Sequence, residues 1–244
     1  MTIRVTFLGS GNAFADGGRS NACIHVGAPG VSLLLDCGGS ALPAIKRAMD
    51  PVTVDGIAVT HLHGDHFGGI PYLVIEQHFA GRDRELVVSG PAGLAARVAM
   101  AELALYPDFF TKTEVRFPVR TEILSEKETR VGGAMVSAFP VQHVPTSEPH
   151  GLRVRAVGTL IAYSGDATWS EDLVRLAKGA DLFICDSSFF DTQDDAHVSY
   201  RTLMAHRGEL DCGRIVLTHL GAETLAHLNE LELEYAVDGT TVDL

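Results

Sequence analysis

The sequence predicts a mixed α/β fold, and two observations carry this prediction. First, short β-prone runs alternate with amphipathic helical patterns along most of the chain. Second, the 244 residues are 46% hydrophobic and 20% charged, which is enough apolar material for a substantial core. No long linker, internal repeat or low-complexity tract divides the sequence, so we expect one domain over residues 1–244.

The individual elements follow from the period of the apolar residues. Runs typical of strands cover 3–8, 22–26, 32–35, 56–59, 85–88, 134–139, 152–157, 159–163, 182–185 and 214–217. Helical periodicity covers 40–50, 67–79, 91–105, 171–178, 199–208 and 221–231. In the first of these helices, Leu42, Ile45 and Met49 share one face.

Two segments are interpreted on weaker patterns. Asp238 and Gly239 lie between the β-prone pieces 233–237 and 240–243, which predicts a closing hairpin. The stretch 106–131 has mixed charges and weak periodicity, and we expect a surface excursion that helps to form a substrate rim.

Charge and cysteine content exclude several classes of protein. The 31 acidic residues outnumber the 19 Lys and Arg residues and give a net charge of −12, so we expect no extended nucleic-acid surface. The N-terminal residues reach a glycine turn within ten positions, unlike a signal peptide, and no apolar run approaches the roughly 20 residues of a spanning helix. Cysteines without C-x-x-C spacing favour free, mostly buried thiols in the cytoplasm; they are Cys23, Cys37, Cys185 and Cys212.

The segment T-H-L-H-G-D-H, residues 60–66, follows the predicted strand 56–59 and carries the chemistry. At a strand end, side chains two apart face the same way, so His61 and His63 can hold one ion. Asp65 and His66 then project elsewhere and can hold a second, while the nearby glycines let the backbone bend tightly. Imidazole and carboxylate ligands suit Zn²⁺ first, with Mn²⁺ or Fe as alternatives. A polar surface turn or hydrogen-bonded core histidines would be the purely structural explanation.

This segment resembles the H-x-H-x-D-H motif of the metallo-β-lactamase superfamily. Later landmarks follow in the expected order, with His143 in FPVQHVP, Asp166 in YSGDATW and His219 in IVLTHLG. Within the superfamily the chain is most similar to the ribonuclease Z and cyclic phosphodiesterase branch, which FLGSGNAF, GGRSNACIHV, HGDHFGGIPYL and SGPAGL resemble. The resemblance implies a four-layered αβ/βα sandwich, with two mixed sheets flanked by helices and the metals at one edge.

The resemblance also implies a ligand set and a mechanism. One metal would lie on His61, His63 and His143, a second on Asp65, His66 and His219, with Asp166 bridging the two. A hydroxide between the ions would attack phosphorus in line. The catalytic candidates are Asp65 and His197, and the latter, in AHVSYRTL, stands where the branch carries an extra histidine. It could neutralise a phosphoryl oxygen or protonate the leaving group, or it could simply end a loop or cap the helix near Ser199.

Three further residues or turns border the expected site. Asp186, in FICDSSF, ends an apolar strand and either contacts a metal-bound histidine or caps a turn. Gly9-Ser10-Gly11 has no dinucleotide or Walker spacing and is expected to be a tight turn that forms one wall of the site. The role of His150, in PHGLRV where the branch has an aromatic residue, stays open.

Two departures from the branch bear on the substrate. No long glycine- and proline-bearing arm is evident in 106–131, and Leu220-Gly221 follows His219 where ribonuclease Z has Phe-Ser. With the acidic charge, these favour a small or cyclic phosphodiester, a nucleotide or an RNA end over transfer-RNA maturation. A thioesterase, lactonase or β-lactamase-type carbonyl hydrolase is the first alternative, and a non-catalytic metal-binding regulatory module is the second. The resemblance also points to a homodimer.

Overall fold

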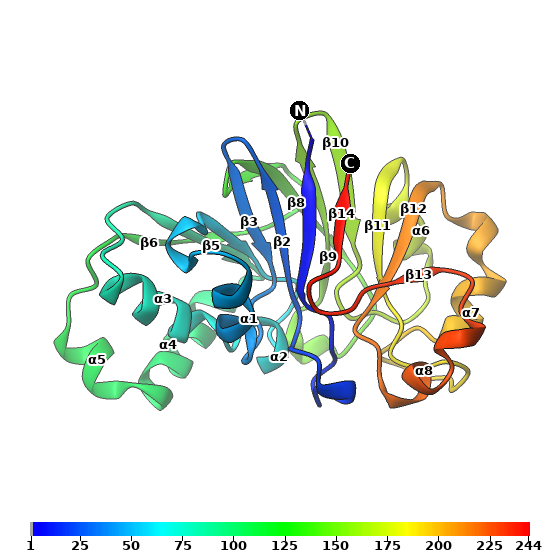
Figure 1. The fold of residues 1–244 in the computed structure, drawn as a ribbon, viewed down its shortest axis with the longest axis horizontal. Helices are drawn as coiled ribbons and strands as arrows, with labels where there is room; N and C mark the ends of the chain where they lie inside the picture. The colour runs from blue at the N-terminus through cyan, green and yellow to red at the C-terminus, as the bar shows by residue number, and fades with distance from the viewer. Residues whose placement is uncertain (1) are drawn as a thin grey trace.

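The computed structural model describes residues 2–244 and contains two seven-stranded sheets (Figure 1). The first sheet has the order β14-β1-β2-β3-β4-β5-β6, with β1 (Arg4–Gly9), β2 (Cys23–Ala28), β3 (Val31–Leu35), β4 (Gly56–Ala58), β5 (Leu86–Gly90), β6 (Val119–Ile123) and β14 (Thr241–Asp243). The second has the order β13-β12-β11-β10-β9-β8-β7, with β7 (Thr129–Val131), β8 (Ala134–Pro140), β9 (His150–Ala156), β10 (Thr159–Tyr163), β11 (Ala180–Asp186), β12 (Cys212–Thr218) and β13 (Glu234–Tyr235). Both sheets mix parallel and antiparallel pairs, and all ten predicted strands are present with ends shifted by a few residues.

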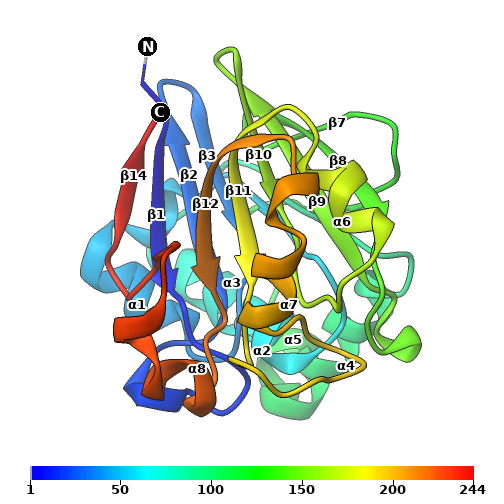
Figure 2. The same cartoon turned by 90° about the vertical axis from the view of Figure 1, so that its right-hand side faces the viewer.

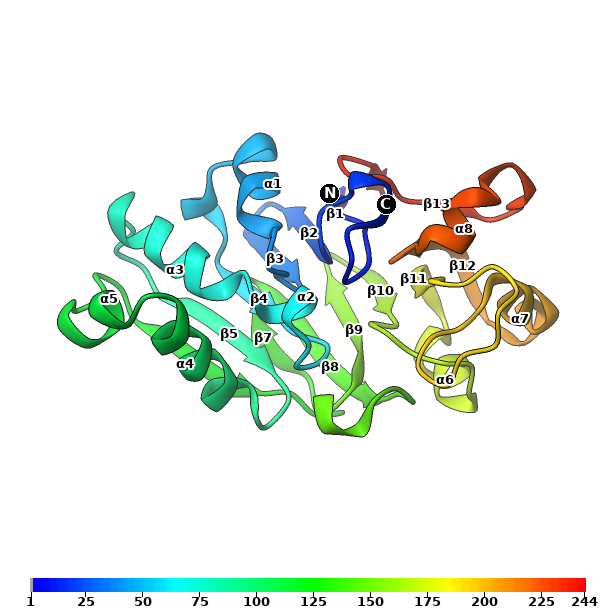
Figure 3. The same ribbon diagram turned by 90° about the horizontal axis from the view of Figure 1, so that it is seen from below.

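Helices cover the outer face of each sheet. The first sheet carries α1 (Ala41–Ala48), α2 (Gly64–Phe67), α3 (Ile70–Phe79), α4 (Leu94–Leu105) and α5 (Pro107–Lys112), and the second carries α6 (Glu171–Ala177), α7 (Tyr200–Ala205) and α8 (Ala222–Ala226). Figure 2 shows α6 and α7 in front of the second sheet, with α6 beside β9, and Figure 3 shows the paired sheets between the two groups of helices. The four-layered αβ/βα sandwich is therefore confirmed.

Strand β3 shows why this sequence stacks two sheets. Leu33 and Leu35 belong to the apolar cluster between the sheets, whereas Leu34 belongs to the cluster under the helices of the first sheet. Successive side chains of a strand point to opposite faces, so an unbroken apolar run requires cover on both sides. Each such fully buried leucine stabilises the fold by about 1.5–3 kcal/mol. The helix α1 supplies part of the cover through Ile45, which is fully buried as its predicted apolar face requires.

The predicted closing hairpin around Asp238 is wrong. β13 pairs in parallel with β12 of the second sheet, whereas β14 pairs antiparallel with β1 of the first. The carboxylate of Asp238 accepts hydrogen bonds from the backbone N–H groups of Ser10 and Ser20, at 3.0 and 2.8 Å. The segment therefore crosses from one sheet to the other, because long-range partners compete successfully with the local turn.

The stretch 106–131 is more regular than expected. It supplies α5 and the edge strands β6 and β7, one in each sheet.

The cysteines have no disulfide partner in the described residues, as predicted, with Cys212 half-buried and the others buried. No helix within residues 2–244 combines the length and the apolar character needed to cross a membrane.

Candidate metal centre

All seven predicted ligands come together where the strands end. Strands β8, β10, β11 and β12 run in the same direction, so their carboxyl ends meet at one edge of the second sheet. The segment after β4 and helix α2 meet them from the first sheet, at the end of the molecule opposite the two termini (Figure 1). Four of the seven residues follow β4 and three follow strands of the second sheet, in the order His61, His63, Asp65, His66, His143, Asp166 and His219.

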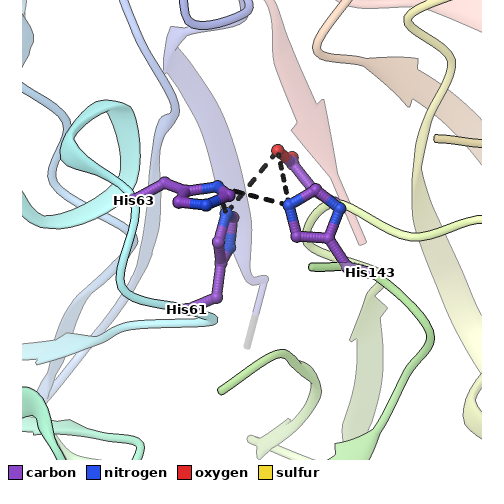
Figure 4. A group of neighbouring side chains, drawn as sticks. His61, His63 and His143 are labelled. Carbon is purple, nitrogen blue, oxygen red and sulfur yellow. Dashed lines mark hydrogen bonds and ion pairs between the residues drawn. The ribbon is translucent and has the colours of Figure 1, made fainter. Parts of the chain in front are cut away.

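The first group of side chains is His61, His63, His143 and Asp166. Nδ1 of His63 lies 3.1 Å from Nε2 of His61 and 3.2 Å from Nε2 of His143. Figure 4 shows the three rings pointing toward one another, His61 and His63 from the segment after β4 and His143 from the loop after β8. Oδ2 of Asp166 faces the same point, 3.6 Å from Nε2 of His61 and 4.0 Å from Nε2 of His143.

The second group is Asp65, His66, Asp166 and His219. Oδ2 of Asp65 lies 3.3 Å from Nε2 of both His66 and His219. Oδ1 of Asp166 lies 3.2 Å from Nε2 of His66 and 3.4 Å from Nε2 of His219. Asp166 thus turns one carboxylate oxygen toward each group.

The residues fit divalent cations on two grounds. A tetrahedral Zn²⁺ with bonds of about 2.0–2.1 Å separates its ligand atoms by about 3.3 Å, and the contacts above cluster around that length. Moreover, Nε2 of His66 and Oδ1 of Asp166 are buried but hydrogen-bond to no described residue. Such orphaned polar atoms are costly unless a cation or water satisfies them.

The electrostatics of the two groups differ. Burial and the neighbouring His66 lower the pKa of His61 well below its ordinary value, which keeps its nitrogen lone pair available. Burial also acts to lower the pKa of His219, but Asp166 and Asp186 outweigh it and raise that pKa to about 10. In the metal-free protein, the His219 ring is therefore protonated at neutral pH.

A buried carboxylate that the sequence analysis missed orients the histidines. Oδ2 of Asp36 accepts hydrogen bonds from Nδ1 of His66 at 2.8 Å and from the hydroxyl of Tyr163 at 3.0 Å. Oδ1 accepts the backbone N–H of Thr60 at 2.8 Å, and the Thr60 hydroxyl lies 3.0 Å from Nδ1 of His61. Because these bonds engage Nδ1 of His61 and His66, Nε2 of each ring faces the candidate metal centre. The signal was present, because Asp36 ends an apolar strand as Asp186 does.

Asp186 both fixes a turn and lies near a candidate ligand, with Oδ1 3.6 Å from Nδ1 of His219. Its Oδ1 accepts the backbone N–H and the hydroxyl of Ser188, at 3.0 and 2.9 Å, which fixes the turn after β11. Its Oδ2 lies 2.7 Å from Nδ1 of His197. The Ser188 hydroxyl also lies 2.9 Å from Nδ1 of His219, so this network orients His219 and His197 together.

The predicted catalytic candidate His197 borders the metal centre. Its ring stacks on His219 with centroids 5.4 Å apart and meets the edge of His143 at 5.2 Å. Burial acts to lower the pKa of His197, yet the carboxylate of Asp186 raises it to about 9. The imidazole therefore carries a proton at neutral pH and turns its Nε2 away from Asp186.

The turn Gly9-Ser10-Gly11 and His150 are the remaining features that the sequence placed near the site. The turn Gly9-Ser10-Gly11 lies against the His219 segment, where the Ser10 carbonyl accepts the His219 N–H at 3.0 Å. The turn therefore lies beside the candidate metal centre. Nδ1 of His150 donates to the carbonyl of Glu148 at 2.9 Å, and His150 belongs to neither group.

Comparisons with known proteins agree with this geometry. The family described as Anti-Pycsar protein Apyc1 matches residues 3–233. The chain is 26% identical to ribonuclease Z of Methanothermobacter thermautotrophicus, covering 89% of this chain and 86% of the relative. It is 27% identical to Anti-Pycsar protein Apyc1 of Bacillus phage BSP38, covering 90% of each.

Solved structures agree on the fold. The metallo-β-lactamase fold protein YhfI of Bacillus subtilis matches with a TM-score of 0.80 and 20% identity over all of both chains. The short form of human tRNase Z matches with a TM-score of 0.77 and 24% identity over 98% of both chains. The resemblance to the ribonuclease Z branch of the metallo-β-lactamase superfamily is therefore confirmed.

Proposed function

The chain belongs to the Anti-Pycsar protein Apyc1 family, and from that premise we propose that it is a dinuclear, metal-dependent phosphodiesterase acting on a small or cyclic phosphodiester. Two Zn²⁺ ions are the proposed cofactors, with Mn²⁺ or Fe as alternatives. One ion would be held by His61, His63 and His143, the other by Asp65, His66 and His219, and Asp166 would bridge them.

The observation that carries this proposal is the orientation of Asp166. Its Oδ2 lies 3.6 Å from Nε2 of His61, and its Oδ1 lies 3.2 Å from Nε2 of His66. A carboxylate that offers one oxygen to each of two histidine groups suits a pair of cations better than a single one. Bound there, two divalent cations would lower the pKa of a water toward neutrality and stabilise charge on the phosphoryl group.

His197 is the proposed proton donor. Asp186 fixes its ring through Nδ1 at 2.7 Å and keeps it protonated, so Nε2 can donate to the leaving oxygen or to a phosphoryl oxygen. Phosphoester cleavage needs such a donor, because an alkoxide is a poor leaving group at neutral pH. Asp65, the other catalytic candidate, contributes as a ligand oxygen between His66 and His219.

The relatives support phosphorus rather than carbonyl chemistry. Several curated relatives are named ribonuclease Z, an activity on phosphodiesters, and a solved structure with a TM-score of 0.76 is described as a diphosphatase of the PhnP family. The net charge of −12 disfavours a long polyanionic substrate. A compact phosphodiester is the substrate class that agrees with both the named relatives and the acidic net charge.

The deciding experiment measures metal content per chain by plasma mass spectrometry and hydrolysis of bis-p-nitrophenyl phosphate on the same sample. We expect about two metals per chain and turnover that chelation abolishes and added Zn²⁺ or Mn²⁺ restores. Two metals with turnover of nitrocefin or a thioester instead would move the function to carbonyl substrates. Two metals without turnover of any of these would favour the regulatory module.

A further inference from the structure

The loop after β8 is fastened to the segment that carries the histidine motif. The backbone N–H of Leu62 donates to the carbonyl of Ser147 at 2.8 Å, and the N–H of His150 donates to the carbonyl of Thr60 at 3.0 Å. The position of the loop therefore sets how far its own ligand lies from the two ligands after β4. These bonds join the segments that supply the histidines of the first group, which are His61, His63 and His143.

Glu148 has an unusual backbone conformation within this loop. It is left-handed, with φ 53° and ψ 58°, a region that residues with bulky side chains rarely adopt. Its N–H donates to the carbonyl of Pro145 at 3.1 Å, and its own carbonyl accepts Nδ1 of His150 at 2.9 Å. A backbone held in this region costs free energy and persists only where surrounding contacts enforce it. The side chain of Glu148 supplies one such contact.

The carboxylate of Glu148 bonds to the start of α4. Its Oε2 accepts the backbone N–H of Gly93 at 3.1 Å, at the N-terminal end of this helix. A carboxylate is favoured there, because the first N–H groups of a helix have no partner within it and carry partial positive charge. Helix α4 covers the first sheet, whereas the loop follows a strand of the second. The bond therefore spans the two halves of the molecule.

The contact between Glu148 and Gly93 lies beside the ligands. A Cβ at Gly93 would lie 2.5 Å from Oε1 of Glu148 and 3.0 Å from Cδ1 of Leu62. Leu62 is 3% exposed and stands between His61 and His63 in the sequence. The carboxylate, the glycine and the leucine are therefore packed closely together next to the ligand-bearing segment.

We propose that Glu148 is a positioning residue for the first group of ligands: its carboxylate holds the loop after β8 at α4 and so fixes His143 relative to His61 and His63. This inference rests on the proposed dinuclear centre and adds a residue that controls one of its two sites.

The second group has separate supports. Oδ2 of Asp36 lies 2.8 Å from Nδ1 of His66, and the Ser188 hydroxyl lies 2.9 Å from Nδ1 of His219. None of these residues belongs to the loop after β8. Loss of the Glu148 carboxylate should therefore weaken metal binding at one site and spare the other.

The test is a titration of the metal-free protein with Zn²⁺, in competition with a chromogenic chelator that resolves the two binding steps. We expect Glu148→Ala to lower the affinity of one step about 10–100-fold and to leave the other unchanged. His143→Ala identifies the affected step, because it removes a ligand of the first group alone. Glu148→Gln keeps an oxygen that can accept the Gly93 N–H, so it should largely retain both affinities.

Asp181→Ala is the matched control for the loss of a carboxylate. Oδ2 of Asp181 accepts the backbone N–H of Leu160 at 2.8 Å, near the start of β10 and remote from the metal centre. This variant removes the same kind of hydrogen bond as Glu148→Ala. We expect both Zn²⁺ affinities to stay at the parent values.

Two further variants separate positioning from stability. Glu148→Gly removes the carboxylate but tolerates the left-handed backbone, so we expect a higher urea midpoint than for Glu148→Ala together with the same weakened site. Gly93→Ala disturbs the contact from the opposite side, since its Cβ would displace the flexible carboxylate, and it should weaken that site as well.

The outcomes separate the positioning role from the metal centre itself. Equal Zn²⁺ affinities of the parent and Glu148→Ala at both sites would overturn the positioning role and leave the dinuclear centre intact. An equal loss at both sites would also overturn it, because it would indicate a general loss of structure. A parent protein that binds fewer than two Zn²⁺ ions would instead overturn the proposed centre and with it the proposed function.

Discussion

Oδ2 of Asp186 lies 2.7 Å from Nδ1 of His197, and the same carboxylate reaches a proposed metal ligand, His219, through the hydroxyl of Ser188. One buried acid thus orients both the proposed proton donor, His197, and a proposed metal ligand, His219. Because Asp186 is fully buried, neither histidine can change its orientation without disturbing the other.

Loss of the imidazole at position 197 should affect turnover and leave metal binding intact. We expect His197→Ala to retain the metal content of the parent and to lose about 10²–10³-fold in kcat on a diester with an alkoxide leaving group, but much less on bis-p-nitrophenyl phosphate, whose p-nitrophenolate leaves without a proton. His206→Ala is a suitable control, since His206 also pairs with a carboxylate, Glu209 at 2.7 Å, but on an exposed surface. A collapse of metal content in His197→Ala would show that His197 is needed for metal binding rather than proton transfer.

The pH dependence should report the contact between Asp186 and His197. The raised pKa of His197, about 9, means that the proton-donating form predominates below this pH and is lost as the pH rises through it. We expect kcat to fall on the alkaline side near pH 9. In Asp186→Asn this limb should move to lower pH, and an unchanged limb would mean that another group sets it.

Removal of the shared carboxylate should abolish both metal binding and activity. Asp166→Ala is expected to lower the bound metal and to reduce hydrolysis below about one thousandth of the parent value. The fold should survive, because the two sheets keep their apolar clusters. Circular dichroism checks the fold, and full activity in this variant would refute the dinuclear site.

Metal uptake should release protons. Asp166 and Asp186 hold the pKa of His219 at about 10 against the effect of burial, so the ring carries an extra proton at pH 7 that a cation must displace. Calorimetric titration of the metal-free protein with Zn²⁺, in buffers of different ionisation enthalpy, should show release of at least about one proton. Binding without proton release would show that the histidines are already neutral.

The Asp36 network should control metal affinity through one hydroxyl. Thr60→Val keeps the side-chain shape but removes the hydroxyl that lies 3.0 Å from Nδ1 of His61. We expect Zn²⁺ affinity to fall about 10–100-fold, as for other groups that orient ligands. Tyr163→Phe removes a different donor to Asp36, one without a hydrogen bond to a histidine, so it should mainly lower stability, by about 1–2 kcal/mol. Equal Zn²⁺ affinities in the two variants would contradict the expectation that Thr60 controls metal binding and Tyr163 controls mainly stability.

Two glycines, Gly64 within the histidine motif and Gly69 just after it, offer a matched pair. A Cβ at Gly69 would lie 2.2 Å from the carbonyl oxygen of Gly38, whereas a Cβ at Gly64 would meet nothing within 4 Å. We therefore expect Gly69→Ala to destabilise the protein by about 2 kcal/mol or more and Gly64→Ala to be tolerated. Urea denaturation of both variants measures this difference, and similar midpoints would mean that the backbone around Gly38 moves freely.

Much of the fold was decided by local patterns. Apolar runs such as the one in β3 indicate a strand that is covered on both faces, and this holds whatever the partner strand is. The spacing from His61 to His66 places four candidate ligands within six residues, and the sequence predicted that they divide between two groups, as they do. The three distant positions, His143, Asp166 and His219, were predicted from the resemblance to the metallo-β-lactamase superfamily, whose later landmarks they match in order.

Relations between distant segments needed the tertiary structure. Asp238 looked like the centre of a hairpin, but its carboxylate bonds to Ser10 and Ser20, more than 200 residues away. The same holds for Asp36 beneath His66 and for Glu148 at Gly93, because neither pair is adjacent in sequence. The sequence by itself determined which side chains could serve as ligands and which strands would carry them. Only the packing of two sheets decided which carboxylate orients which histidine, because such contacts depend on the register and stacking of strands rather than on local propensity.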